Sequence, residues 1–449
     1  MTIDMLPDVA LLRIFDCYME EALSVLQRWH ILVHVCRKWR GVVFGSPRRL
    51  NLRLFCEART PVRETLDVWP LLPIIISVHR PQIWDADNIV AALERNDRIC
   101  NLTFLDISRS QSEKVLGEMQ QPFPALTNVW LRFKSSPVIP ASFLGGSAPS
   151  LRTFALERIP FPGLPKLLLS ATHLVDLDLR DIPHSGYFSP ETIVTCVSTL
   201  TALKGLRVEF ESPRSCPDRR SRHPPPRTRN LLPVLTKLWF KGVSEYLEDL
   251  VARINAPLLD NLLITIYNQL ILDTPQLTQL INRSSRFKAR EARVVFNDRE
   301  VWVSLPQTGN GALSMVISCW QSDWQLSSLA QICSSSFPQT LIPAVEHLYI
   351  HRGAWPPDWQ DDLEISQWLE LLHPFTAVKD LYISEGFIPR IAPALKELVG
   401  ERVSEVLPAL QTLFLPETLL EPAQEAIGRF IAARQIAGQP ITTSHWDGR

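Results

Sequence analysis

The feature that most constrains the fold of this chain is a short apolar pattern that returns along most of its length. The pattern is φ-x-x-φ-x-φ, where φ is an apolar residue, and six of its nine copies carry a proline two residues before the first φ. In a strand, the last two apolar residues point to the same side and can be buried together. Proline cannot donate to a β-ladder, so it marks the turn that enters each strand. The nine copies begin at Leu126, Leu151, Leu174, Leu203, Leu235, Leu259, Val345, Val378 and Leu410.

The spacing of these copies predicts a repeat array. Successive copies lie 23 to 33 residues apart, except for one interval of 86 residues that starts at Leu259, in which residues 292–296 and 313–317 fit as degenerate copies. One unit cannot bury its apolar face alone, whereas stacked units can. We therefore expect a leucine-rich-repeat-like solenoid. Its expected parts are a linker or N-terminal cap over 51–120, repeats over 121–420, and a C-terminal helical cap and tail over 421–449. The expected helices between strands are 191–203, 246–254, 324–333, 366–372 and 394–406.

The side chains between the last two apolar positions point away from the core, because side chains alternate across a strand. These residues are Trp130, Ala155, Asp178, Arg207, Trp239, Leu263, Tyr349, Tyr382 and Phe414. Five of the nine are aromatic, and exposed aromatic residues on a continuous surface are frequent anchors of binding sites. We hypothesise that this face binds a protein target; the alternative is that loops or a terminal tail cover the aromatic residues. The predicted target-binding residues are Trp130, Arg132, Trp239, Lys241, Tyr349, His351, Tyr382 and Phe414.

The N-terminal residues carry a different, helical pattern. Leu11, Ile14, Phe15 and Tyr18 have the spacing of one apolar helical stripe, and Pro7 suits the first turn of that helix. A later helix is expected to repeat the spacing with Leu32, Val35, Cys36, Trp39 and Val43. Helices this short are unstable alone, so the stripes must pack on each other or on another protein.

Residues 1–50 resemble an F-box on this pattern, from Leu6-Pro7 through Ile14-Phe15 and Trp39-Arg40 to Ser46-Pro47. The resemblance implies binding to a Skp-family adaptor, which links F-box proteins to a cullin–RING ubiquitin ligase. The later repeats resemble the irregular leucine-rich repeats of many F-box proteins, such as the large fungal group. An alternative is that the same residues only pack a small helical domain. The residues that the resemblance places at the adaptor are Leu6, Pro7, Leu11, Ile14, Phe15, Val35, Cys36, Trp39 and Val43.

Composition narrows the remaining classes of function. The 449 residues carry a net charge of −1, so no overall field attracts nucleic acid, and no apolar run is long enough to span a membrane. The eight cysteines form no Cys-x-x-Cys pair, which favours a reducing compartment, cytoplasmic and/or nuclear. No motif for a nucleophile, a phosphate-binding loop or a metal protease is present. We expect no cofactor, no metal, and neither membrane nor nucleic acid partners.

Two local signals have simpler explanations. Residues 212–230 hold six arginines, one aspartate and five prolines. That composition predicts a disordered insert; a nuclear-import signal, a nucleic-acid patch or a Pro-rich docking site are the alternatives. His347 and His351 would share a helical face, but on a strand they lie roughly 13 Å apart, too far to ligate one ion.

The sequence thus predicts an α/β chain in which N-terminal F-box helices precede an irregular leucine-rich-repeat-like solenoid. The expected function is substrate recognition within a Skp–cullin–F-box ubiquitin ligase. The partners would be the Skp-family adaptor with its cullin complex, and a protein substrate whose identity the sequence does not give. The chain itself would not be an enzyme, because its part is to bring the target close to activated ubiquitin. The alternative is a repeat scaffold that uses the same helices for protein binding without ubiquitination.

Overall fold

The structure is a computed structural model that describes residues 6–20, 28–45, 52–54, 56–59, 61–68, 71–78, 84–215, 228–267, 272–284, 286–307, 311–319, 324–355, 357, 365–417 and 419–446. The chain divides into two compact units. The first comprises residues 1–188 and 195–203, and the second comprises residues 189–194 and 204–449. Each unit is described by itself.

The first unit begins with three short helices, α1 (Asp8–Glu20), α2 (Arg28–Val35) and α3 (Arg37–Gly45). They share a small core in which Leu11, Phe15 and Val43 are completely buried, and Leu72 from later in the unit packs against it. The rings of Phe15 and Trp39 contact each other with centroids 4.8 Å apart. This cluster joins residues that lie far apart in sequence, which stabilises helices too short to form alone.

The single later helix expected from Leu32 to Val43 is wrong. Two helices form instead, and the break falls at Cys36. The thiol Sγ of Cys36 accepts a hydrogen bond from the backbone N–H of Trp39, at 3.4 Å, and so satisfies one of the free donors at the start of α3. As a result Val35, at the end of α2, is turned out to solvent with 51% of its surface exposed.

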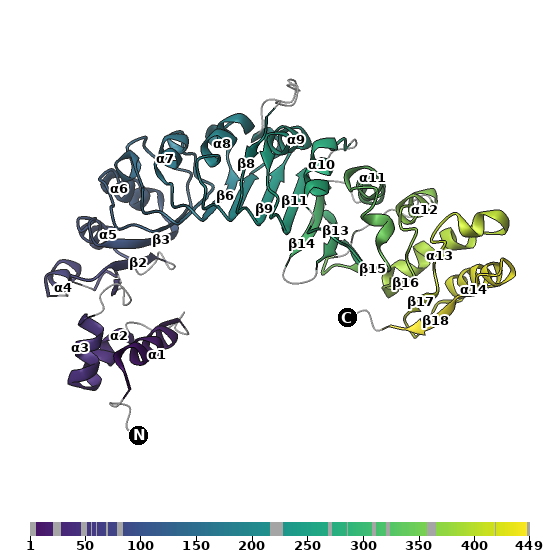
Figure 1. Cartoon of the computed structure of the whole chain (residues 1–449), viewed down its shortest axis with the longest axis horizontal. Coiled ribbons are helices and arrows are strands. Elements are labelled where there is room, and N and C mark those ends of the chain that lie inside the picture. The colour runs from purple at the N-terminus through teal and green to yellow at the C-terminus, as the bar shows by residue number, and fades with distance from the viewer. Residues whose placement is uncertain are drawn as a thin grey trace. The chain divides into compact units, whose positions relative to one another are not determined.

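The rest of the first unit is a parallel sheet with helices on one face (Figure 1). Its six strands pair in chain order, each with the next along the sequence. The strands are β1 (Leu52–Leu54), β2 (Ile74–Val78), β3 (Ile99–Ile107), β4 (Asn128–Phe133), β5 (Thr153–Glu157) and β6 (Asp176–Ile182). The helices are α4 (Val62–Val68), α5 (Ala86–Leu93), α6 (Arg109–Glu118) and α7 (Leu164–Ser170); α8 (Pro190–Val197) follows.

The second unit contains ten strands of the main sheet, in the order β7-β9-β11-β14-β13-β12-β15-β16-β17-β18. A separate parallel pair joins β8 (Asn230–Leu231) to β10 (Ile254–Asn255). The main strands are β7 (Gly205–Phe210), β9 (Lys237–Gly242), β11 (Asn261–Tyr267), β12 (Glu291–Phe296), β13 (Glu300–Pro306), β14 (Ala312–Ser318), β15 (His347–Arg352), β16 (Asp380–Ile383), β17 (Thr412–Leu415) and β18 (Thr442–His445). The helices are α9 (Ser244–Ala252), α10 (Pro275–Arg283), α11 (Trp324–Gln331), α12 (Ile365–Leu372), α13 (Ile388–Lys396) and α14 (Glu421–Ile436).

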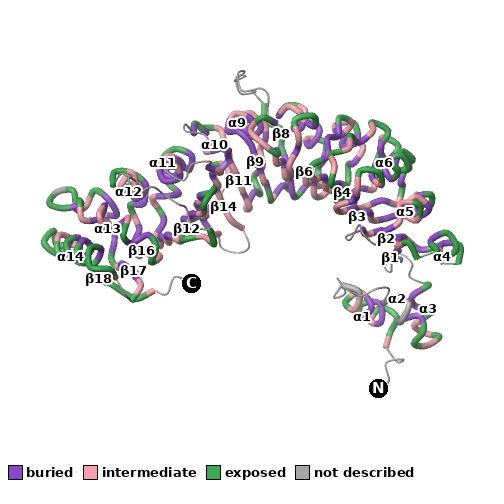
Figure 2. Tube along the Cα trace, turned by 180° about the vertical axis from the view of Figure 1, so that it is seen from behind, coloured by how far each residue is buried: buried purple, intermediate pink, exposed green. Residues whose placement is uncertain are grey.

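All nine copies of the apolar pattern form strands, and their last two apolar residues are buried in every case. Along β4, β9 and β15, for example, buried positions alternate with partly exposed ones. Figure 2 shows the same division, with buried residues between strands and helices and exposed residues on the outer helix surfaces. The pattern therefore fixes which side chains face the helices and which face solvent.

The predicted fold class, F-box helices followed by a leucine-rich-repeat-like solenoid, is wrong. The chain is α/β, but the strands belong to a large and mostly parallel sheet that already begins at Leu52. Residues 292–296 and 313–317 do lie in strands β12 and β14, yet β13 between them is antiparallel to both. The interval of 86 residues therefore contains two hairpin connections and not two further repeats, because the apolar spacing predicts a strand but not its direction.

One expected helix has different bounds, and one expected loop falls largely outside the described residues. The helix expected over 394–406 begins earlier, at Ile388, and ends at Lys396; Gly400 then adopts a positive φ of 60° and a short 3-10 helix follows over Gly400–Ser404. Most of the basic, Pro-rich stretch expected at 212–230 lies outside the described residues, which stop at Ser215 and resume at residue 228.

Arg434 of α14 is the one charged residue that is completely buried among those described, and it ties this helix to the preceding segment. Its guanidinium donates to the backbone carbonyls of Val403 at 3.1 Å and Leu407 at 2.9 Å, and to Oε1 of Gln439 at 2.8 Å. Burial lowers the pKa of Arg434, and hydrogen bonds to carbonyl dipoles offset part of the cost of burying the charge.

Replacing Arg434 with methionine is expected to lower the free energy of opening of α14 by about 2–4 kcal/mol, because buried carbonyls would lose their donors. Hydrogen exchange of the α14 amides would measure this. Arg429→Met, at an exposed position on the same helix, should change little. Equal protection of α14 in the two variants would show that Arg434 does not hold this helix.

Candidate protein-binding site

The N-terminal helices divide the predicted adaptor-binding residues into a core and a surface. Leu11, Phe15 and Val43 are completely buried and form the interior. Leu6, Cys36 and Trp39 are half-buried, and Pro7 is exposed. Ile14 and Val35 are exposed, at 43% and 51%. The sequence pattern therefore did not separate the residues that form the core of this cluster from those that remain exposed.

Two apolar side chains that the sequence did not single out are also exposed on these helices. Val9 of α1 is 68% exposed and Phe44 of α3 is 42% exposed. With Ile14 and Val35, four large apolar side chains face solvent on three short helices. Lys38 connects α3 to the segment just before α1, because its Nζ donates a hydrogen bond to the carbonyl of Leu6 at 2.8 Å. The helices thus form a small scaffold with apolar groups left uncovered.

In the second unit, the strand register aligns the outward side chains into one row across ten strands. Each member lies opposite the next in the register of neighbouring strands. The hydroxyls of Ser304 and Ser314, 2.8 Å apart, confirm that the antiparallel strands present the same face. We call this set the outer row: Arg207, Trp239, Leu263, Ser314, Ser304, Arg293, Tyr349, Tyr382, Phe414 and Ser444.

Three neighbouring aromatic residues of the outer row, Tyr349, Tyr382 and Phe414, form a stack that we call the aromatic ladder. The Tyr349 and Tyr382 rings are 4.1 Å apart with 12° between their planes, and Tyr382 and Phe414 repeat these values. His351 stacks on Tyr349 at 5.8 Å. Burial, and then a hydrogen bond with Tyr349, raise the pKa of Tyr382 to about 12, so its hydroxyl is neutral at physiological pH. The ladder is an uncharged row of stacked rings, in line with the sequence prediction of an aromatic face.

The expectation that a terminal tail covers the aromatic residues also has support in the structure. Trp446, which follows the last strand, packs at a steep angle against the ladder. Its ring centroid lies 6.1 Å from that of Tyr349, 5.3 Å from that of His351 and 5.4 Å from that of Tyr382. All four residues are partly exposed. Sequence reasoning missed Trp446, because it lies outside the apolar pattern, after the polar run Thr442–His445.

The other end of the outer row is basic. The guanidinium of Arg207 lies 4.5 Å from the centre of the Trp239 ring, and Nζ of Lys237 lies 6.0 Å from it. Nζ of Lys241 lies 5.8 Å from the ring of Tyr267. Strands β7 and β9 together contribute three cations and one carboxylate, Glu209, which pairs with Arg207 at 3.8 Å. Cation–π contacts of this kind hold the aromatic rings in place beneath positive charge.

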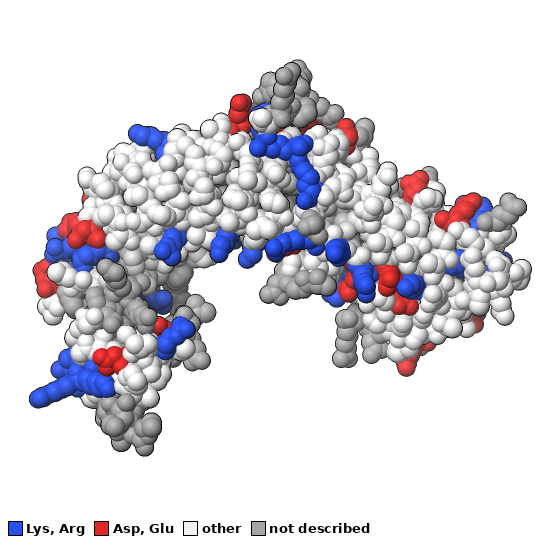
Figure 3. Space-filling model, in the orientation of Figure 1, with Lys and Arg blue, Asp and Glu red and all other residues white. Residues whose placement is uncertain are grey.

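Figure 3 shows how charge is distributed on this side of the molecule. Basic side chains lie near β9, whereas basic and acidic side chains alternate over β15 and β16. There Nζ of Lys379 pairs with Glu346 at 3.3 Å, and Nδ1 of His347 lies 2.8 Å from Oδ2 of Asp380. The ladder is therefore bordered by paired polar and charged groups, and the Trp239 end by an excess of cations.

The first unit carries the two remaining predicted target-binding residues, Trp130 and Arg132. Trp130 is 36% exposed. Arg132 makes two hydrogen bonds to Asp106, at 3.1 and 2.7 Å, and lies 3.7 Å from Glu157. The hydrogen bonds to Asp106 contribute most to raising the pKa of Arg132. Asp106 sits at a register shift of β3 with a positive φ of 61°, which aims its carboxylate at Arg132. Arg132 is thus engaged within the chain.

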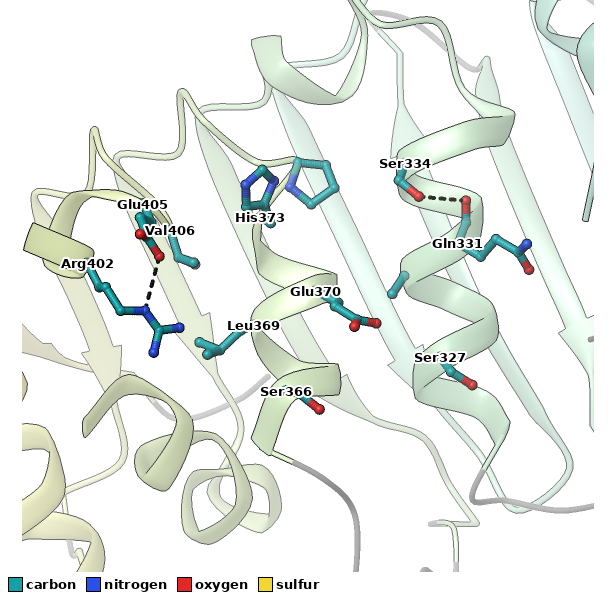
Figure 4. A pocket seen from close by; sticks show the side chains of 12 residues that line it. Ser327, Gln331, Ser334, Ser366, Leu369, Glu370, His373, Arg402, Glu405 and Val406 are labelled. Carbon is teal, nitrogen blue, oxygen red and sulfur yellow. Dashed lines mark hydrogen bonds and ion pairs between the residues drawn. The ribbon is translucent and has the colours of Figure 1, made fainter. Parts of the chain in front are cut away.

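A groove of about 580 Å³ lies on the helix side of the second unit, away from the outer row (Figure 4). Residues of α11, α12 and the segment after α13 line it, and none of them was predicted as a site residue. Two of its charged groups pair with each other, Arg402 through Nε with Glu405 at 3.2 Å. Ser334 likewise donates to the carbonyl of Gln331 at 3.1 Å. The lining shows no nucleophile hydrogen-bonded to a base among its described contacts.

The described residues contain neither a cluster of metal ligands nor a membrane-spanning helix. No group of three or more His, Cys, Asp or Glu side chains in that part of the chain is placed to hold a metal ion. Within the same residues, no helix has both the length and the apolar character needed to cross a bilayer.

Comparison with known proteins adds no assignment: no protein-family model matches this sequence, and no curated protein matches it either. Any functional conclusion therefore depends on the two surfaces described above and on the sequence pattern of residues 1–50.

The pKa of His351 is lowered, first by burial and then by the positive charge of Arg293, while Glu291 acts in the opposite direction. Because the folded pKa lies below the ordinary value of 6.5, the unfolded chain binds more protons as the pH falls through that value. The contribution of neutral His351 to stability is therefore present above about pH 6.5 and is lost below it.

Hydrogen exchange of β15 and β16 measured from pH 7.5 to 5.5 is expected to show less loss of stability in His351→Gln than in the parent chain. His373→Gln, an exposed position on the helix side, controls for the loss of one histidine. If His351→Gln and the parent chain lose stability equally, His351 does not contribute to the pH dependence of this region.

Proposed function

We propose that this chain is a substrate receptor of a Skp–cullin–F-box type ubiquitin ligase, in the cytoplasm or the nucleus. The N-terminal helices bind the Skp-family adaptor, and the outward sheet face binds a protein target. The chain itself carries out no chemistry; it holds the target near activated ubiquitin on the ligase, which raises the effective concentration of the reacting groups.

The observation that carries this proposal is the exposed apolar surface of the N-terminal helices. Val9, Ile14, Val35 and Phe44 remain in contact with solvent although the three helices bury a core of other apolar residues. Removing such side chains from water contributes about 25 cal/mol per Å² of apolar surface, from which the cost of association is subtracted. The F-box resemblance of residues 1–50 supplies the identity of the partner, and a helical surface with apolar anchors suits recognition of one protein by another.

The outward sheet face supports the second half of the proposal. The outer row presents four aromatic residues, Trp239, Tyr349, Tyr382 and Phe414, on strands that are held rigidly by their neighbours. Aromatic side chains with few rotatable bonds lose little entropy on binding and are common among the dominant contacts of interfaces. The face lies on a different part of the chain from the adaptor-binding helices, so one surface can be altered without the other.

Binding of a purified Skp-family adaptor to the full chain, measured by titration calorimetry, tests the proposal. The double variant Ile14→Ala/Val35→Ala is expected to bind about thirtyfold to several hundredfold more weakly, because each truncation removes roughly 1–2 kcal/mol of apolar contact. Both residues are exposed, so the helices should remain folded. Val68→Ala on α4, at a position 84% exposed, is the matched control and should bind like the parent chain.

The outcomes separate the two candidate roles. Adaptor binding by the parent chain that the double variant loses, together with recruitment of a cullin, supports the ligase function. Adaptor binding without cullin recruitment supports a scaffold that does not direct ubiquitination. If the parent chain does not bind the adaptor, the proposal is wrong.

A further inference from the structure

Trp446 differs from the other rings at the aromatic ladder in how it reaches the surface. Tyr349, Tyr382 and Phe414 come from the middle of their strands, where the backbone is fixed on both sides. Trp446 comes instead from the residue after β18, the last strand of the sheet. Its ring lies at a steep angle to the ladder rings, with interplanar angles of 63° to Tyr349 and 74° to Tyr382.

The segment that carries Trp446 pairs with β17 through its backbone but buries little side-chain surface. Ile441 is buried, but all four residues of β18 are exposed. The backbone N–H of Thr442 donates to the carbonyl of Gln411 at 2.8 Å, and that of Trp446 donates to the carbonyl of Leu415 at 2.9 Å. A terminal strand with no buried side chains opens at a low cost in free energy compared with the core strands. Trp446 can therefore leave the ladder without unfolding the unit.

We propose that the aromatic ladder is a binding site for an aromatic side chain on an extended segment of a target protein, and that Trp446 occupies this site in the free chain. The proposal rests on the target-binding role of the sheet face described above. The target segment replaces Trp446, so the C-terminal segment of the chain competes with the target. Displacement of Trp446 uncovers the ladder, and binding of the target ring covers it again.

The chemistry of the ladder supports an aromatic ligand. Offset and edge-to-face contacts between rings are favourable because the positive ring edge meets the negative face of its neighbour, and Trp446 already uses this geometry. The guanidinium of Arg293, 5.7 Å from the Tyr349 ring, borders the ladder on one side. Asp380, on the same face of β16, lies 2.8 Å from His347 and adds a polar rim. An aromatic residue flanked by polar residues fits this arrangement, as the chain's own sequence around Trp446 shows.

Titration of the full chain with the apolar dye bis-ANS tests whether Trp446 covers the ladder. Trp446→Ala is expected to bind dye with a several-fold stronger fluorescence signal than the parent chain, because the ladder is uncovered. Trp446→Phe keeps a ring and should resemble the parent chain. In the Trp446→Ala background, adding Tyr382→Ala should remove the gain. Adding Ile436→Ala, at an 89% exposed position on α14, should not.

A second titration tests the preference for an aromatic segment. A synthetic peptide with the sequence of residues 440–449 should displace bis-ANS from the Trp446→Ala chain, whereas the same peptide with its tryptophan replaced by alanine should not. Equal dye binding by the parent and Trp446→Ala chains would overturn the covering role of Trp446. Displacement by both peptides or by neither would overturn the preference for an aromatic side chain.

These measurements do not involve the adaptor. The dye and peptide experiments can therefore fail while the N-terminal helices still bind a Skp-family adaptor, and adaptor binding can fail while the ladder still takes an aromatic segment. The two proposals are thus overturned by different results.

Discussion

The alternation of buried and outward side chains along hydrogen-bonded strands is the constraint on which the rest of this structure depends. Apolar residues two positions apart lie under the helices, so the residue between them must face solvent. In the second unit the strands are aligned so that these residues meet their counterparts across ten strands, from Arg207 to Ser444. A slip of one residue in any strand would turn its buried side chains outward. Burial of the core residues therefore also determines which positions of each strand form the outward face.

The two proposed surfaces differ in how they are built. The adaptor-binding surface consists of apolar side chains that a small helical core leaves uncovered, such as Ile14 and Val35. The target-binding surface consists of aromatic residues supported by a rigid sheet. The ladder lies at one end, and Trp239 with the neighbouring cations Arg207 and Lys237 lies at the other. A receptor that links two proteins needs surfaces that act independently, and residues on separate elements satisfy that requirement.

Much of the local structure could be predicted from the sequence, because a strand needs only a short apolar pattern. All nine patterned segments are strands, and Tyr349, Tyr382 and Phe414 lie together as expected. The overall architecture could not be predicted, since the pattern does not encode strand direction, and β13 is antiparallel. The break at Cys36 depends on one thiol hydrogen bond, and the position of Trp446 depends on pairing between β17 and β18. Neither leaves a periodic signal in the sequence.

Hydrogen exchange of the full chain, with and without a purified Skp-family adaptor, tests the central claim of two separate surfaces most directly. We expect the adaptor to slow exchange in α1, α2 and α3 and to leave β15 to β18 unchanged. Slower exchange in β15 to β18, or no change in the three helices, would contradict it.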